Sequence, residues 1–196
     1  LALGVTVFGN GGMNTDYPGG QISAQSACGA FRGGQDAPYN LLCGSGDLGV
    51  DLMQLMIAPY ASWQFVKNHS IGVAPVIAYQ RFKAEGLQAF DNEAFSTAPG
   101  SVTNNGYSDS WGLGVRIGYM GQLTEQISIG AAWASKIDMG AFDEYKGLFA
   151  QQGGFDIPSN FTIGVAFKPT PQWLIALDFE RIFYDDAPSV SNQLAN

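Results

Sequence analysis

The stretch from Trp111 to Asp138 constrains the fold most, because its large apolar residues recur at every second position. Between Trp111 and Tyr119 the odd positions are all large and apolar, whereas the even positions hold three glycines and Arg116. After a turn at residues 121–125 the alternation resumes. A period of two is typical of β-strands whose two faces meet different surroundings. The stretch therefore predicts an antiparallel hairpin with one apolar face and one face of small residues.

The small face of this hairpin distinguishes a membrane sheet from a soluble one. In a soluble β-sandwich the face turned away from the core is usually polar and solvated. Here that face is mostly Gly, Ala and Ser, and the apolar face carries Trp111 and Tyr119 near its ends. Aromatic residues mark both interfaces of a membrane β-barrel. The pattern favours lipid against the apolar face and a lumen behind the small one.

The composition agrees with a membrane β-barrel. Charged residues make up 13% of the chain, about half of the usual quarter. No apolar run reaches the ~18 residues of a membrane helix, whereas barrel strands need only about 9 to 11 residues. A formal net charge of -8 and a single histidine, His69, argue against nucleic acid as a partner and against a metal site. The chain starts without Met or a basic segment, so we expect any signal peptide to lie outside it.

Seven segments have the alternation of strands, and the connections between them alternate in length. The segments are residues 1–10, 51–65, 70–82, 111–119, 127–138, 160–168 and 173–184. Long loops at about 11–49, 83–110 and 139–159 are separated by short turns, and we expect a short helix at 141–152. Bacterial outer-membrane barrels have short periplasmic turns and long extracellular loops. The sequence therefore predicts one all-β domain over residues 1–196, a partial antiparallel transmembrane β-barrel.

Cys28 and Cys43 are the only cysteines, and both lie in the first long loop. A disulfide between them would close a loop of about 15 residues, contribute roughly 3 kcal/mol in the chain-entropy model and imply an oxidising compartment. Two unpaired thiols are the alternative. Zinc-site spacing is absent from the sequence.

Pro59 and Pro75 fall inside the second and third segments, where each removes a donor from the strand ladder. They indicate either a bulge at a strand end or locally weakened pairing in the wall. Gly9, Gly11 and Gly12 likewise permit a bend at the end of the first segment.

Four stretches carry a resemblance that spans most of the chain: residues 8–20, 78–90, 145–171 and 176–190, beginning FGNGGMNTDYPGG, AYQRFKAEGLQAF, YKGLFAQQGGFDIP and ALDFERIFYDDAPSV. In this order they are similar to the outer-membrane long-chain fatty acid and aromatic-hydrocarbon transporters of the FadL group. The resemblance implies a monomeric barrel of about 14 strands with an N-terminal hatch. Because seven strands cannot form an even-stranded barrel alone, the rest belongs to a longer chain, as we favour, or to a partner chain.

The resemblance also implies a function and a location. Members of this group take a hydrophobic substrate, a fatty acid or aromatic hydrocarbon, into a groove between extracellular loops and release it sideways at a kinked strand. We therefore expect passive transport in the bacterial outer membrane, with contacts to membrane lipid and lipopolysaccharide and without a cofactor. We hypothesise that the kink lies at Phe8, Gly9, Gly11 and Gly12. The two cysteines do not belong to the pattern of this group.

Candidate site residues follow from the loops and the lumen face. An apolar ligand needs an apolar slot, and the loop residues proposed to line it are Leu87, Phe90, Phe95, Phe142, Tyr145, Leu148 and Phe149. The alternative is that these residues only pack the loops together. By the alternation of faces, the lumen charges are Arg116, Lys136, Asp178 and Glu180. We expect Lys136 to pair with Asp138, and Arg116 with Asp178 or Glu180, while binding of a carboxylate head group is the alternative.

No set of residues suits covalent catalysis. A Ser-His-Asp triad would need His69, which lies at a short turn, across the membrane from the long loops. The acidic pairs at 143–144 and 185–186 are typical of solvated loops rather than of a calcium site. The alternatives to a transporter are a receptor or adhesin barrel that binds a partner through its disulfide-closed loop, a lipid-modifying enzyme, and a soluble all-β binding domain.

Overall fold

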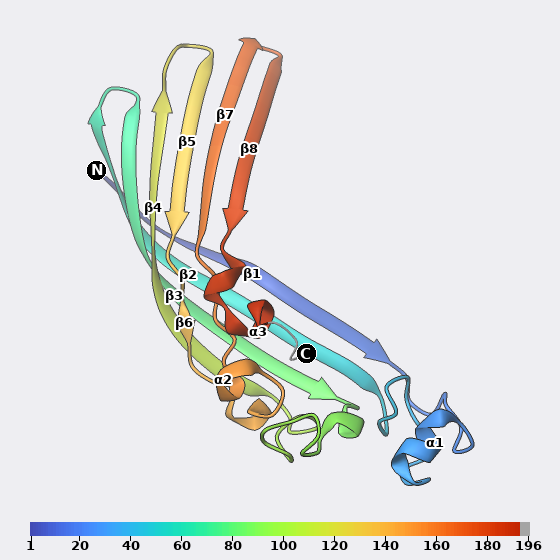
Figure 1. Cartoon of the computed structure of the whole chain (residues 1–196). Coiled ribbons are helices and arrows are strands. Elements are labelled where there is room, and N and C mark those ends of the chain that lie inside the picture. Colours follow the sequence, from blue (N-terminus) through green and yellow to red (C-terminus); the bar gives the residue numbers. More distant parts are fainter. Residues whose placement is uncertain (193–196) are drawn as a thin grey trace.

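The computed structural model describes residues 1–192, and the strands form one curled antiparallel sheet (Figure 1). Its strands are β1 (Ala2–Tyr17), β2 (Leu48–Val66), β3 (His69–Glu85), β4 (Ser108–Gln122), β5 (Ile127–Ala134), β6 (Asp138–Met139), β7 (Asn160–Thr170) and β8 (Trp173–Ile182). Their order is β1-β2-β3-β4-β5-β7-β8, with β6 beside β4. The predicted fold class is confirmed as a β half-barrel. Residues 193–196 of the predicted domain lie outside the described residues.

The helices are short and belong to the loops and the C-terminal segment. They are α1 (Ala27–Arg32), η1 (Gln88–Phe90), η2 (Asp143–Tyr145), α2 (Ala150–Gly153), η3 (Tyr184–Asp186) and α3 (Pro188–Ser191). In residues 1–192, no helix has the length and hydrophobicity needed to cross a membrane. The short helix predicted at 141–152 is wrong as one element. Phe149 has extended backbone angles (φ -100°, ψ 152°) between η2 and α2, and Gln151 and Gln152 inside α2 have positive φ angles of 52° and 57°.

Short and long connections lie at opposite ends of the sheet, as the sequence predicts. The tight turns β2–β3, β4–β5 and β7–β8 gather at the top of Figure 1, and the long loops gather at the lower end with α1 and α2. The alternation follows from antiparallel pairing of strands that are neighbours in the sequence.

The two faces of the sheet differ as predicted. On the outer face, Leu3, Leu113 and Leu177 are 74%, 74% and 71% exposed. On the inner face, small and medium apolar side chains of β2 and β3 are buried under residues of the third long loop; this cluster contains Met56, Ala58, Ala74, Val76, Ala78, Ile137, Met139 and Ile157. A sheet with large exposed apolar side chains on one face and protein on the other suits a wall between lipid and a lumen.

β1 ends at Tyr17, beyond residue 10 where the sequence pattern predicted its end. The ladder with β2 shifts register between Gly9 and Gly11 and then continues to the pair Tyr17–Leu48. The register shift lies within the segment for which a kink was hypothesised. It makes Asn10 an extra residue, so the face on which each later residue lies is reversed, and the alternation used for the prediction breaks there.

Pro59 and Pro75 face each other across β2 and β3. The ladder between β2 and β3 runs to the pair Ile57–Ile77 and resumes in the same register at Ala61–Val73. Within the described sheet, the residues between these two pairs are not paired across β2 and β3. Two opposed prolines supply no N–H donors, so the ladder is interrupted on both strands at the same level. The predicted weakening is therefore present between β2 and β3. The β1–β2 ladder continues past Pro59, and the β3–β4 ladder continues past Pro75.

Candidate functional site

Aromatic side chains pack over the inner face near the long loops. Phe82 of β3 is 1% exposed, and Phe142 and Tyr145 are completely buried. The ring centroid of Phe82 lies 4.9 Å from that of Tyr145 and 4.7 Å from that of Phe149. We call this group the inner aromatic cluster; it comprises Leu52, Phe82, Ala84, Phe142 and Tyr145, with Val50, Leu87, Leu148, Phe149 and Phe155 packed against them.

The third long loop supplies most of this cluster because it turns back into the curled sheet. A bridge between Ile137 and Ile157 closes the base of the loop, and the Phe142 amide donates to the Gly153 carbonyl at 2.8 Å. The loop places its phenyl rings against β2 and β3 and leaves its charged residues Asp143 and Glu144 exposed.

The Tyr145 hydroxyl joins this loop to two other segments. It accepts a hydrogen bond from the Ala84 amide at 3.1 Å and donates one to the Gly106 carbonyl at 2.5 Å. Burial raises the pKa of Tyr145 above its ordinary value, because the charged phenolate would lose its hydration. The hydroxyl therefore remains a neutral donor.

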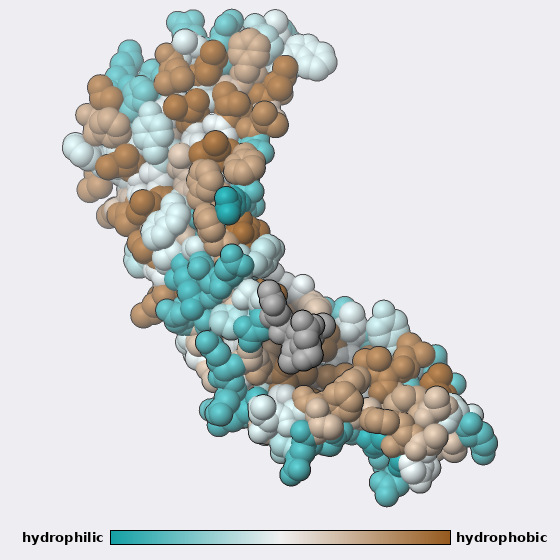
Figure 2. Space-filling model, viewed as in Figure 1, coloured by the Kyte–Doolittle hydropathy of each residue, from teal (hydrophilic) through white to brown (hydrophobic). Residues whose placement is uncertain are grey.

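A second aromatic group lies outside the first, where two loops meet. Phe95 contacts Phe90 and Phe31, with ring centroids 5.6 Å and 6.5 Å apart. All three rings are exposed, Phe31 and Phe95 by 58% each. We call Phe31, Phe90 and Phe95 the outer aromatic patch; Figure 2 shows hydrophobic side chains gathered over this loop end, at the lower right.

Cys28 and Cys43 form the predicted disulfide, with Cα atoms 5.1 Å apart. The bond ties α1, which carries Phe31, to the end of the same loop. Asn40 anchors that loop to the next one, because its buried side-chain amide donates to the Gly86 carbonyl at 2.9 Å. The outer aromatic patch thus lies on two loops that are held by a disulfide and by a buried hydrogen bond.

The predicted ligand-binding residues divide between these two groups. Leu87, Phe142, Tyr145, Leu148 and Phe149 belong to the inner aromatic cluster, and Phe90 and Phe95 belong to the outer aromatic patch. Sequence reasoning missed Phe31, Phe82 and Phe155. Phe82 had a signal, because it is an even-numbered residue that continues the inner-face alternation of β3. Phe31 lies in the six-residue helix α1, which is too short to show a period, and Phe155 lies in an irregular segment.

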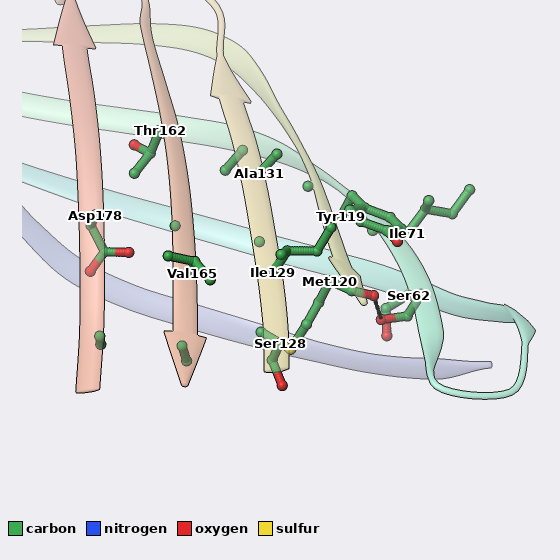
Figure 3. Close-up of a pocket in the computed structure, with 18 residues that line it drawn as sticks. Ser62, Ile71, Tyr119, Met120, Ser128, Ile129, Ala131, Thr162, Val165 and Asp178 are labelled. Carbon is green, nitrogen blue, oxygen red and sulfur yellow. Dashed lines mark hydrogen bonds between the residues drawn. The ribbon is translucent and has the colours of Figure 1, made fainter. Parts of the chain in front are cut away.

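A trough runs along the inner face nearer the short turns. Its volume is about 560 Å³, and small side chains form most of its floor, among them Ser62, Gly72, Gly118, Gly130, Thr162 and Gly164. Figure 3 shows Ser128, Thr162 and Asp178 on the neighbouring strands β5, β7 and β8. The small-residue face of the sequence therefore becomes the floor of an open, weakly polar trough.

The outer face opposite this trough is apolar. A hollow of about 620 Å³ there is lined by Trp63, Ile117 and Trp133 among others. At the other end of the outer face, the Tyr79 and Trp111 rings lie 4.8 Å apart. Between Trp111 and Tyr119 the strand rises by roughly 26 Å, close to the height of the apolar band of a membrane barrel.

The charges predicted for the lumen agree only in part with the structure. The lumen position predicted for Lys136 is wrong: Asp138 pairs in the ladder with outer-face Leu113, and Ile137 between them is buried in the inner-face cluster, so Lys136 and Asp138 lie on the outer side of the wall. Lys136 forms the predicted ion pair with Asp138, with Nζ 2.6 Å from Oδ1, and a second with Asp156 at 2.9 Å. The prediction for Arg116 is wrong: in residues 1–192 its side chain forms no ion pair with Asp178 or Glu180. Arg116 and Glu180 instead both line one hollow of about 230 Å³.

The acidic pairs have structural contacts. Asp143 pairs with Lys146 at 2.9 Å, and Asp186 accepts a hydrogen bond from the Ser159 amide at 3.2 Å, just before β7 begins. The Ser159 hydrogen bonds hold the pKa of Asp186 below its ordinary value. Within the described part of the chain, no cluster of three or more His, Cys, Asp and Glu side chains suits a metal ion.

Comparison with solved structures identifies the fold. A TodX deltaS2S3 mutant, described as a monoaromatic hydrocarbon channel, aligns with a TM-score of 0.63 and 18% identity over 94% of this chain. The chain has the fold of this channel. The toluene transporters TodX of Pseudomonas putida and TbuX of Ralstonia pickettii align with TM-scores of 0.61 and 0.60 and identities of 18% and 16%, over 94% and 93% of this chain.

The chain spans about half the length of these structures, since each alignment covers 51% of the solved chain. At these identities the likeness establishes the fold, and it confirms the resemblance that the sequence predicts. No family model matches the sequence, and no curated protein matches it. The solved neighbours are transport channels and not enzymes.

Proposed function

We propose that the complete protein is a passive transporter of small hydrophobic compounds across the bacterial outer membrane. The observation that carries this proposal is the opposite character of the two faces: large exposed apolar side chains outside, and a floor of small residues leading to aromatic rings inside. Such a wall separates lipid from a passage that a hydrocarbon can enter without meeting many charges.

Monoaromatic hydrocarbons are the proposed first substrates, ahead of long-chain fatty acids. The similar solved structures, a monoaromatic hydrocarbon channel and a toluene transporter, support this choice. The inner aromatic cluster and the outer aromatic patch also support it, because a planar ring can pack edge to face against their rings. The exposed outer aromatic patch would collect the hydrocarbon, and Leu87, Leu148 and Phe149, which are only partly buried, would receive it next.

The proposal includes the surroundings of the barrel. Lipid would cover the outer face between Trp111 and Tyr119, and lipopolysaccharide would meet Arg81 and Lys83, which stack on the Tyr107 ring at the loop end of the wall. The complete barrel would be monomeric, and a lateral opening would lie at the register shift of β1. The described chain supplies seven strands of that wall and the short β6.

The direct test is uptake of radiolabelled toluene by vesicles that contain the full-length barrel, with the variant Gly130→Phe. A Cβ atom at Gly130 would come only within 3.8 Å of another residue, the Tyr119 carbonyl oxygen, so the fold accepts the side chain while the phenyl ring fills the trough. Ile163→Phe is the matched control, since Ile163 is 46% exposed on the outer face and lines the outer hollow rather than the trough. We expect Gly130→Phe alone to abolish uptake; equal uptake by both variants would refute the passage.

A receptor function remains the competing proposal, because the disulfide-closed loop exposes Phe31 and Leu41 by 58% and 50%. If the protein is a receptor, Phe31→Ser should abolish capture of a surface partner. Neither the wild-type barrel nor the variant should then take up toluene. Uptake by the wild-type barrel decides for the transporter.

A further inference from the structure

A row of side-chain amides crosses the inner face at the level of the register shift in β1. Asn10 Nδ2 donates to Gln54 Oε1, and Gln54 Nε2 donates to Gln80 Oε1, both at 3.0 Å. Gln80 Nε2 then donates to Ser110 Oγ at 2.9 Å and to the Phe155 carbonyl oxygen at 3.0 Å. We call Asn10, Gln54 and Gln80 the amide row; its members come from β1, β2 and β3.

The Phe155 carbonyl determines the direction of the row. A carbonyl oxygen can only accept, so Gln80 must turn its NH₂ group toward it and its own oxygen toward Gln54. Gln54 must then present NH₂ to Gln80 and oxygen to Asn10, which must donate in turn. Gln80 is completely buried and Gln54 is 7% exposed, so reversing either amide would leave buried polar atoms unpaired.

The far end of the row is the extra residue of β1. Gly9 pairs with Leu55 and Gly11 with Gln54, which leaves Asn10 without a partner in the ladder. The extra residue in a bulge has no ladder partner to hold it. The hydrogen bond to Gln54 holds Asn10 over the inner face.

We propose that Gln54 and Gln80 are positioning residues that hold the bulge of β1 in place through Asn10. The functional importance of this role rests on the proposed function, which places a lateral opening of the wall at the bulge. The row also connects the opening to the ligand path: Phe155 belongs to the inner aromatic cluster, with its ring centroid 5.2 Å from that of Phe149.

Hydrogen exchange of the ligand-free, full-length barrel in detergent micelles tests the positioning role. In Gln54→Leu the row is cut, and we expect the amides of β1 around Asn10 to exchange about tenfold faster than in the wild type. Gln64→Leu is the matched control, because Gln64 lies on the same face of the same strand but is exposed near the short turn. Asn10→Ala removes the exposed end of the row with little effect on packing, and should speed exchange equally.

A near-isosteric variant separates hydrogen bonding from shape. In Gln54→Glu, burial favours the neutral carboxyl group, which can donate to Gln80 through its O–H and accept from Asn10, so exchange around Asn10 at pH 5 should match the wild type although the amide is gone. Wild-type exchange in both Gln54→Leu and Asn10→Ala, or equal acceleration in Gln64→Leu, would overturn the positioning role.

Toluene uptake by the same variants distinguishes the two proposals. Faster exchange at the bulge together with no uptake by the wild-type barrel supports the amide row and refutes the transport function. Uptake by the wild type together with unchanged exchange in the variants overturns the amide row and leaves the transport function standing.

Discussion

Replacing Tyr145 by Phe tests whether the third long loop is held in the lumen by one hydroxyl. The change removes a single oxygen atom, and the ring remains packed against Phe82 at 4.9 Å. It leaves the Ala84 amide and the Gly106 carbonyl without this partner. Ala84 is completely buried, so water cannot replace the lost acceptor, and the free energy of unfolding should fall by about 1 to 3 kcal/mol.

The measurement is the guanidinium unfolding midpoint of the barrel in detergent, with Tyr107→Phe as control. Tyr107 also loses a hydroxyl hydrogen bond, to Asp51 Oδ2 at 2.6 Å, but its ring is 45% exposed and water replaces the partner. The control should therefore shift the midpoint much less. Equal shifts in the two variants would show that the Tyr145 hydroxyl does not hold the loop.

The same residue predicts a dependence on pH. Because burial raises the pKa of Tyr145 in the folded protein, the folded state binds that proton more tightly than the unfolded state does. The resulting stabilisation is complete below the unfolded pKa of about 10 and is lost as the pH rises through the higher folded value. The difference in stability between wild type and Tyr145→Phe should shrink over this alkaline range. A difference that stays constant up to strongly alkaline pH would contradict the assignment.

Three further predictions concern the covalent and backbone framework. Replacing Cys28 and Cys43 together by Ser should lower loop stability by roughly 3 kcal/mol, seen as faster proteolysis between residues 18 and 47 while the strands stay intact. Pro59→Val returns a donor to the interrupted β2–β3 ladder, and exchange of the neighbouring amides should slow by up to about tenfold. Gly112→Ala should destabilise the barrel by about 1 to 3 kcal/mol, whereas Gly130→Ala should leave the unfolding midpoint nearly unchanged.

The strands were predictable from the sequence because the period of two encodes both the strand and its orientation. The alternation alone assigned Leu113 and the other odd-numbered residues of β4 to the outer face, without information on the partner strands. The same rule failed at Asn10, where one inserted residue reverses the alternation, and the glycines that follow carry too little side chain to reveal a strand. Only the ladder to β2 shows that β1 continues to Tyr17.

The site was less predictable, because its contacts join residues far apart in the sequence. The pair Lys136–Asp138 could be inferred from two steps along one face, but the second partner, Asp156, is brought in by the returning loop. Arg116 was assigned partners on β8 without knowledge of the strand order, in which β5 and β7 lie between β4 and β8 and keep those side chains beyond ion-pair distance. The loop residues predicted to line one slot fall into an inner cluster and an outer patch, which only the fold separates, and their role in ligand binding stays a prediction.

Glycines of the inner face have two different structural roles. At Gly112 an added Cβ would contact Met139, Ile137 at 2.6 Å and the Asp138 carbonyl at 2.9 Å, so this glycine lets the third loop pack against the wall. At Gly130 the nearest such atom is 3.8 Å away, so that glycine leaves the trough open. One end of the lumen is filled by the protein's own loop and the other is left free by the same residue type. Under the proposed function, a hydrophobic molecule that enters among the loops would meet aromatic packing first and the open trough afterwards.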